Sequence, residues 1–186
     1  PAPVARKVSI VIPVFNEEGN LPRLLPRLVP VLEGLGRPWE VVFVDDGSRD
    51  RSLTLLREAA RSFPGRVKAV ELLRNAGQHM AIMAAFGETE GEYVITLDAD
   101  LQNDPADIPR LIAKMDAEGA DVVNGVRIKR RDSWVRLVSS RIANNARNWV
   151  TNESVTDVGC SLRAMRTEYV KRVRLFRNMH RFLPTL

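Results

Sequence analysis

The sequence lacks the features that would place the protein outside the ordinary globular class. Its 186 residues contain one cysteine, Cys160, so no disulfide can form within the chain. No uninterrupted apolar run reaches the roughly 18 residues that a transmembrane helix needs. These absences exclude a disulfide framework and a membrane span within these residues, and they fit a reducing compartment.

Two phosphate-binding signatures are also missing. No Gly-x-Gly-x-x-Gly follows the first apolar run, which argues against a dinucleotide fold. No Gly-x-x-x-x-Gly-Lys-Ser/Thr is present, which argues against a P-loop. If the protein binds phosphate groups, a metal ion and arginines must neutralise their negative charge.

Acidic residues are scarce in the C-terminal third. Residues 1–126 carry 14 basic and 19 acidic side chains (net −5), whereas residues 127–186 carry 14 basic and 4 acidic ones (net +10). Such a cationic segment is able to meet the phosphates of a nucleic acid, a lipid head group or a substrate. Composition alone favours the simpler interpretation of a solvated basic face, because 23 of the 28 basic residues are arginine.

Five short runs rich in β-branched residues predict strands. Three of them are nearly continuous apolar runs, which is typical of strands buried on both faces of a parallel sheet. Their starts lie 25 to 32 residues apart, which is the spacing of βαβ units, so we expect an open, mostly parallel α/β sheet with helices on both faces and right-handed crossovers. The runs are Val8–Val14, Glu40–Asp45, Val67–Leu73, Glu92–Asp98 and Asp121–Arg127.

Helical patterns separate these runs. Leucines at helical spacing between Leu21 and Leu32 predict a helix that Pro26 and Pro30 make kinked or irregular. We expect residues 1–130 to form the core and residues 131–186 a basic helical segment of the same domain. The other expected helices are Ser52–Phe63, Gln78–Glu88, Pro105–Glu118, Trp134–Val150 and a last one around Glu168–Arg177, with a loop at Thr151–Asp157 before the last.

Polar signatures follow three of the expected strands. They are Asn16-Glu17, Asp45-Asp46-Gly47-Ser48, and Asp98-Ala99-Asp100-Leu101-Gln102. Each alone is a common turn or helix start. Because ligands of open α/β sheets bind beyond the carboxyl ends of the strands, their convergence on one edge predicts a binding site.

Asp98 and Asp100 are the candidate metal ligands. Their spacing, at the point where a strand leaves the sheet, lets both carboxylates face one hard cation, and Gln102 adds an amide oxygen. Mg²⁺ and Mn²⁺ prefer such oxygen ligands and are often shared with substrate phosphates. Asp45 and Asp46 are suited to accept hydrogen bonds from a base or a ribose.

Arginines of the basic third are the candidate phosphate contacts. Arg127 ends the fifth expected strand and therefore lies on the same edge as the acidic signatures. Planar guanidinium groups suit phosphate oxygens, although a surface ion pair is the simpler interpretation for each of the others. Those others are Arg136, Arg141, Arg147, Arg163 and Arg166.

Three stretches together resemble glycosyltransferase family 2, the inverting nucleotide-sugar transferases with a GT-A, Rossmann-like fold. They are VSIVIPVFNEEGNL, VVFVDDGSRDRS and LDADLQNDP. RNAGQHMAIMAAF and DVGCSLRAMR make the chain similar to the polyprenyl-phosphate members, above all to those that use undecaprenyl phosphate in lipid A or cell-envelope modification. The resemblance covers about Val8 to Leu186.

The resemblance implies roles for individual residues of the donor pocket. Pro13, Phe15 and Glu17 match the motif that lines the nucleotide pocket, where the family more often has Tyr in place of Phe15. Asp45 matches the residue that reads the base. The remaining matches are Asp46, Gly47 and Ser48, which shape the loop, Gly77 in the donor pocket, and Asp98, Asp100 and Gln102 at the metal.

The resemblance also implies the acceptor side and the reaction. Arg127 and Arg136 match positions that contact phosphate of the donor or acceptor, and Asp157 matches an acidic active-site position. The implied reaction is metal-dependent transfer of a sugar, with inversion, from a nucleotide sugar, UDP-linked by preference, to a polyprenyl phosphate. We expect the metal and Arg127 to stabilise the leaving nucleotide, and nucleic acid is not an expected partner.

Relatives of this kind continue past the position of Leu186 into amphipathic and transmembrane helices. The resemblance therefore implies either a truncated catalytic piece or a shortened homologue. We expect the full-length protein at the cytoplasmic face of a bacterial inner membrane, against the membrane surface. The chain as given is expected to be soluble and cytoplasmic, and oligomerisation stays open.

Other functions remain open at this point. One is a family 2 transferase with a saccharide acceptor, which needs no lipid. Another is a non-catalytic module that binds sugar nucleotides, although an intact Asp98 and Asp100 pair argues against it. A nucleotidyltransferase would need a basic, glycine-rich loop after the first strand, where this chain is acidic.

Overall fold

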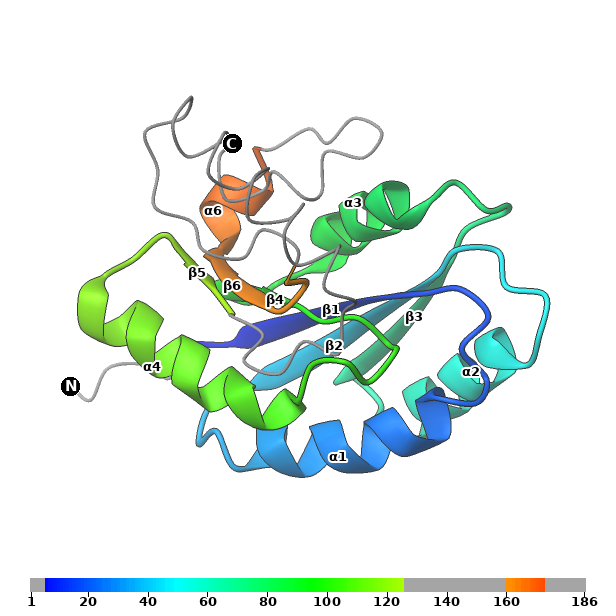
Figure 1. The fold of residues 1–186 in the computed structure, drawn as a ribbon, viewed down its shortest axis with the longest axis horizontal. Helices are drawn as coiled ribbons and strands as arrows, with labels where there is room; N and C mark the ends of the chain where they lie inside the picture. Colours follow the sequence, from blue (N-terminus) through cyan, green and yellow to red (C-terminus); the bar gives the residue numbers. More distant parts are fainter. Residues whose placement is uncertain (1–5, 126–159, 173–186) are drawn as a thin grey trace, which may run out of the picture.

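A computed structural model of the protein describes residues 6–125 and 160–172. Within them a single sheet has six strands in the order β3-β2-β1-β4-β6-β5 (Figure 1). β1 to β4 run parallel to one another, and β6 is antiparallel to both of its neighbours. The strands are β1 Val8–Val14, β2 Trp39–Asp45, β3 Val67–Glu71, β4 Tyr93–Thr96, β5 Val122–Asn124 and β6 Arg163–Arg166.

Helices cover both faces of this sheet, as predicted. One face carries α1, α2 and α4, and the other carries α3 and α6 (Figure 1). The bounds are α1 Leu21–Glu33, α2 Ser52–Ser62, α3 Gln78–Glu88, α4 Ile108–Glu118 and α6 Thr167–Val170, with a 3₁₀ turn, η1 Pro105–Asp107, before α4. The predicted open, mostly parallel α/β sheet is confirmed.

The central strands are buried on both faces because their sequences are apolar at nearly every position. All seven residues of β2 and all four of β4 are buried, and β1 is buried except at Pro13. A strand that alternated polar and apolar residues would leave one face wet. The sheet is therefore a rigid platform on which loops at its carboxyl edge are held.

Helix α1 is continuous over 13 residues although Pro26 and Pro30 lie inside it. Each proline lacks an N–H, which leaves one carbonyl a turn earlier without a helical partner. Pro22, Pro26 and Pro30 lie on the exposed face, while Leu24 and Leu28 face the core. The two internal prolines therefore do not divide the helix, and the predicted kink stays a prediction.

Strand β6 was not predicted. It lies between β4 and β5, pairing Arg163 with Thr96 and Arg166 with Tyr93. Its sequence, RAMR, is charged at both ends and finds its partner about 70 residues away, so no local pattern signals it. Part of the segment expected to be helical is therefore an inner strand of the sheet.

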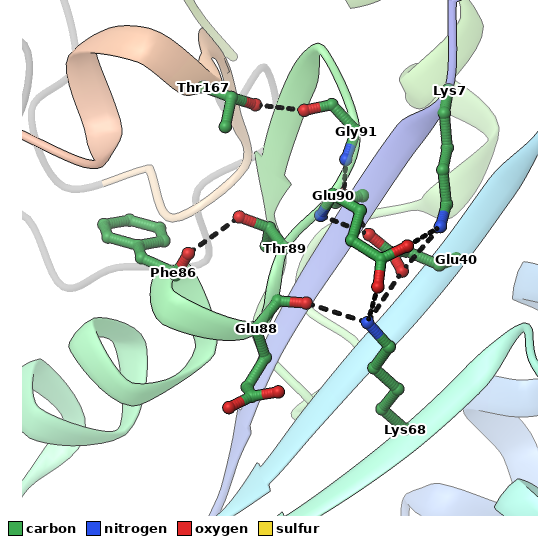
Figure 2. A network of polar contacts seen from close by, with 10 residues as sticks. Lys7, Glu40, Lys68, Phe86, Glu88, Thr89, Glu90, Gly91 and Thr167 are labelled. Carbon is green, nitrogen blue, oxygen red and sulfur yellow. Dashed lines mark hydrogen bonds and ion pairs between the residues drawn. The ribbon is translucent and has the colours of Figure 1, made fainter.

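A buried polar network closes the amino edge of the sheet (Figure 2). The Glu40 carboxylate is fully buried and accepts hydrogen bonds from Ser9 Oγ at 2.6 Å and from the Glu90 backbone N–H at 2.7 Å. Lys7 and Lys68 lie 2.9 and 3.2 Å from its other oxygen, and both also pair with the Glu90 carboxylate. The network joins β1, β2, β3 and the turn before β4.

None of the helices in residues 6–125 and 160–172 is long and apolar enough to cross a bilayer. The predicted helix at Trp134–Val150 and the loop at Thr151–Asp157 lie outside the described residues. The predicted last helix begins as α6, and its remainder also lies outside them.

Candidate active site

A cleft of roughly 350 Å³ opens at the carboxyl edge of the sheet, between the ends of β1 and β4. The strand order reverses here, since β2 and β3 lie on one side of β1 and β4 on the other. Ligands of open α/β sheets bind at such switch points. The lining residues come from three strand ends and one loop: Pro13, Val14, Phe15, Glu17, Asp46, Asn75, Gly77, Gln78, Asp98, Ala99 and Asp100.

The loops after β1 and β2 are tied to each other by side-chain hydrogen bonds. Asn16 adopts a φ of 55°, its backbone N–H donates to Ser48 Oγ at 3.0 Å, and its side-chain oxygen accepts from the Arg49 N–H at 2.8 Å. The Glu17 N–H donates to Ser52 Oγ at 2.8 Å. These bonds fix the entrance of the cleft, where Phe15 is 44% exposed.

The pKa of Asp50 in the second of these loops lies below its usual range. Partial burial raises it, but hydrogen bonds from the side chain and backbone of Ser52 and from the Glu18 N–H outweigh that effect. Asp50 is therefore a charged anchor for both loops.

Asp45 and Asp46 are adjacent and buried, but their carboxylates accept hydrogen bonds from different loops. Asp45 accepts from the Ser48 N–H at 3.0 Å through Oδ2, and its buried Oδ1 has no hydrogen-bond partner among the described residues. Asp46 uses both oxygens, accepting from the N–H groups of Ala76 at 2.7 Å and Gly77 at 2.9 Å. Asp46 therefore anchors the loop between β3 and α3.

Asp98 and Asp100 follow β4 and share the cleft. Asp98 Oδ1 accepts from Gln78 Nε2 at 2.9 Å, and Asp100 Oδ1 accepts from the Gln102 N–H at 3.0 Å. Leu101 has a φ of 62°, so the chain turns sharply after Asp100. The turn brings both carboxylates to the cleft while Ala99 between them is buried.

The segment before β6 supports this acidic loop from the side. Thr96 Oγ1 donates to the Ser161 carbonyl at 2.6 Å, and Asn103 Nδ2 donates to Ser161 Oγ at 2.8 Å. Cys160 is 2% exposed and lies 3.4 Å from Asn103 Oδ1. Residues from both described ranges therefore hold the loop in place.

The two carboxylates fit a divalent cation that shares its coordination with a ligand. Among residues 6–125 and 160–172 no group of three His, Cys, Asp or Glu side chains gathers around one point. Mg²⁺ commonly uses one or two protein carboxylates together with substrate phosphates and water. Asp98 and Asp100 are suited to that protein share, and the cleft leaves room for a phosphate ligand.

The cleft brings together most of the residues predicted to bind the donor or the metal. Pro13, Phe15, Glu17, Asp46, Gly77, Asp98 and Asp100 all line it. Asp45, Gly47, Ser48 and Gln102 do not, and Ser48 Oγ is occupied by a backbone contact. Arg127, Arg136, Asp157, Arg141 and Arg147 lie outside the described residues.

Two arginines of β6 have positions that the sequence did not predict. Arg166 lies at the opposite edge of the sheet, 3.3 Å from Asp121 and 3.7 Å from Glu92, so the simpler interpretation of an ion pair is confirmed for it and it is not a phosphate contact at the cleft. Arg163 is 3% exposed and donates to the Cys160 carbonyl at 3.1 Å. Both placements follow from the unpredicted strand.

Sequence reasoning missed Asn75 and Gln78 as lining residues. Asn75 lies between β3 and α3 and Gln78 begins α3, in a stretch that carries no acidic signature. The available signal was position: this stretch follows a parallel strand, so it crosses the same edge as the acidic loops.

A family model for glycosyl transferase family 2 matches residues 9–174. The chain belongs to glycosyl transferase family 2. The match includes nearly all of β1, every lining residue of the cleft, and β6. The family resemblance seen in the sequence is therefore confirmed for this family 2 chain.

One curated relative of this family 2 chain is an undecaprenyl-phosphate 4-deoxy-4-formamido-L-arabinose transferase from Edwardsiella ictaluri (strain 93-146). The two are 48% identical over 179 residues, which is 96% of this chain. The alignment covers 55% of the relative, so the chain spans about half the length of that protein.

Solved structures with a similar fold include two transferases with bound nucleotides. Glucosyl-3-phosphoglycerate synthase from Mycobacterium tuberculosis, in complex with Mn²⁺, UDP and phosphoglyceric acid, has a TM-score of 0.69 at 21% identity, over 88% of this chain and 57% of that one. A mannosyltransferase from Pyrobaculum calidifontis, in complex with GDP-Man and Mn²⁺, has a TM-score of 0.64 at 22% identity, over 90% and 46%. The predicted GT-A fold is confirmed by this likeness.

Proposed function

We propose that this chain is the catalytic part of a metal-dependent, inverting glycosyltransferase that moves a sugar from a UDP-sugar to undecaprenyl phosphate. The observation that carries the proposal is the acidic cleft at the switch point, where Asp98 and Asp100 face the same space. The 48% identity to an undecaprenyl-phosphate transferase supports the lipid acceptor.

Each wall of the cleft has a distinct task in this reaction. Asp98 and Asp100 hold the divalent cation, which when bound neutralises charge on the donor diphosphate and on the leaving nucleotide. Phe15, exposed at the mouth, offers its ring to the nucleobase. The buried and unpaired Oδ1 of Asp45 is suited to accept an N–H from the base after a small shift of the Gly47 loop.

The transfer itself needs little proton chemistry from the protein. An oxygen of the acceptor phosphate attacks the anomeric carbon, the bond from that carbon to the diphosphate breaks, and UDP leaves with the electron pair. The acceptor phosphate is already an anion at neutral pH, so it needs no strong general base. Positioning and charge stabilisation therefore supply most of the catalysis.

The acceptor side of the proposal rests on the basic third. Arg127 and Arg136 contact phosphate of donor or acceptor, and Asp157 contributes an acidic group, in roles that stay predictions from the resemblance. The net charge of +10 over residues 127–186 supports contact with an anionic membrane surface on the cytoplasmic side.

The test is nucleotide binding followed by transfer. The chain is titrated with UDP and with GDP, each with and without Mn²⁺, and its melting temperature is recorded, because a ligand selective for the folded state raises it. Release of UDP from a UDP-sugar is then measured with undecaprenyl phosphate in detergent, with a soluble saccharide, or with neither.

A Mn²⁺-dependent shift with UDP, together with UDP release that requires undecaprenyl phosphate, is the expected result. Release that requires the saccharide instead would replace the acceptor and keep the enzyme. Binding of neither nucleotide by a folded sample would overturn the proposal.

A further inference from the structure

The loop between β3 and α3 reaches the cleft because two adjacent residues at the end of β2 hold both of its ends. Its first residue, Leu72, donates its N–H to the Asp45 carbonyl at 2.9 Å. Its last residues, Ala76 and Gly77, donate theirs to the two oxygens of Asp46. Asp46 is 3% exposed, so this double acceptor is shielded from water.

Gly47 lets the two loops touch backbone to backbone. A Cβ at Gly47 would lie 2.6 Å from the Asn75 nitrogen and 2.8 Å from the Arg74 carbonyl carbon. Its φ of 70° is also one that other residues rarely adopt. The loop from 72 to 77 therefore has little freedom to move away from β2.

Gln78 is the first residue of α3 and comes directly after the anchored Gly77. Its Nε2 donates to Asp98 Oδ1 at 2.9 Å. The orientation of the amide follows from chemistry, because an ionised carboxylate accepts hydrogen bonds only, so the amide NH₂ must face it. The amide is neutral, so it orients the carboxylate without competing with a cation for its charge.

We propose that Gln78 is a positioning residue for the metal site and that Asp46 acts through it. Asp46 fixes Gly77, Gly77 starts the helix at Gln78, and Gln78 sets the rotamer of Asp98. This inference rests on the proposed function, since it needs a cation at Asp98 and Asp100. It also gives Asp46 a role other than contact with the nucleotide, because both of its oxygens are already used.

Partners that orient metal ligands typically contribute 10- to 100-fold in metal affinity. We therefore expect Gln78→Met, which keeps the length and removes the donor, to weaken Mn²⁺ binding roughly 10-fold or more. Affinity for UDP without metal and the melting temperature of the metal-free protein should stay unchanged, because neither depends on the rotamer of Asp98.

The experiment measures free Mn²⁺ by electron paramagnetic resonance while the whole chain is titrated in saturating UDP. Met80→Gln is the matched control, since Met80 lies in the first turn of the same helix, is 44% exposed and does not line the cleft. Asp46→Asn should weaken Mn²⁺ binding in the same direction. Combined with Gln78→Met it should add little, because residues that act through one contact are not additive.

The outcomes separate this inference from the function on which it rests. If the wild-type chain binds no Mn²⁺ with UDP, the proposed function fails. If the wild type binds Mn²⁺ and Gln78→Met binds it within twofold, only the positioning role fails. Full additivity of the two substitutions would overturn the role of Asp46 and leave that of Gln78.

Discussion

The two edges of the sheet treat carboxylates in opposite ways. At the amino edge Glu40 and Glu90 are compensated by two lysines, Lys7 and Lys68, within 3.2 Å. At the carboxyl edge Asp45, Asp46 and Asp100 form no ion pair with any of the residues in 6–125 and 160–172, and neutral N–H groups are their donors.

The charges around the carboxylates suit the amino edge to stability and the carboxyl edge to ligand binding. Burial raises the pKa of Glu40, but hydrogen bonds from Ser9, Glu90 N–H and the two lysines outweigh it and lower the pKa below its usual range. Local neutralisation of that kind favours stability. At the carboxyl edge Asp100 lines the cleft and accepts only from the neutral Gln102 N–H, so its charge is available for a cation from solution and this edge is suited to binding.

The largest effect should come from removing charge at the carboxyl edge. Asp100→Asn keeps an oxygen for the Gln102 N–H and should preserve the turn, but it removes half of the carboxylate pair. We expect transfer to fall about 1,000-fold, which corresponds to about 4 kcal/mol in the activation free energy, while the melting temperature is retained. Initial rates of UDP release measure it.

Asp107→Asn is the control for that substitution, because Asp107 is an exposed carboxylate in η1 whose ion pair with Arg110 spans 3.7 Å. Equal loss of transfer in both variants would mean that the effect is not specific to the cleft.

Removing charge at the amino edge should instead affect stability. Glu40→Ala leaves two lysines without their buried partner and Ser9 without its acceptor. We expect the free energy of unfolding to fall by about 3 kcal/mol, the range found when one member of a buried pair is removed. Urea unfolding measures it.

Glu33→Ala is the matched control, since the ion pair of Glu33 with Arg66 is exposed and spans 3.9 Å. Its expected effect is below about 1 kcal/mol. A loss in Glu40→Ala no larger than in this control would contradict a stabilising role for the network.

A glycine substitution tests the close packing of loops at the carboxyl edge. Gly47→Ala must relieve a 2.6 Å contact with the Asn75 backbone and also adopt a positive φ. We expect about 2 kcal/mol or more of destabilisation. Gly36→Ala has a similar φ of 64° with nothing within 4 Å, so it isolates the cost of φ, about 1 kcal/mol. Equal losses would show that the loops separate easily.

The smallest expected effect is a pH dependence at the amino edge. Hydrogen bonds from Lys68 and Lys7 lower the pKa of Glu90 from 4.5 to about 2. A lowered pKa in the folded state stabilises it above the unfolded pKa, and this contribution disappears as the pH falls towards 2. The stability difference between wild type and Glu90→Gln should therefore be largest near neutral pH and shrink between pH 4.5 and 2.

Urea unfolding at a series of pH values tests that expectation. Glu88→Gln, two residues earlier, removes an exposed carboxylate that contacts neither lysine and serves as the control. A difference between wild type and Glu90→Gln that grows on acidification would refute the assignment.

The sequence was most informative where the signal is local. Continuous apolar runs located β1, β2 and β4 because burial on both faces leaves a recognisable pattern. Asp98 and Asp100 were identifiable because strand ends of a parallel sheet meet at one edge. Those inferences needed only residues close together in the chain.

Long-range contacts were not predictable in the same way. β6 depends on pairing with β4, about 70 residues earlier, and its short charged sequence gives no period. Gln78 looks like an ordinary helix-start residue until the structure places it 2.9 Å from Asp98. Asp46 looked like a ligand contact, and only the N–H groups of Ala76 and Gly77 explain its carboxylate.

The position of β6 also determines when, during synthesis of the chain, the sheet can be completed. All of the lining residues of the cleft have been synthesised by residue 100, yet β4 gains its second neighbour only when residues 163–166 follow. Until then β4 is an edge with open N–H and carbonyl groups, which favours pairing with other chains. Nascent chains of this protein should therefore depend most on chaperones after the cleft has formed and before its sheet is closed.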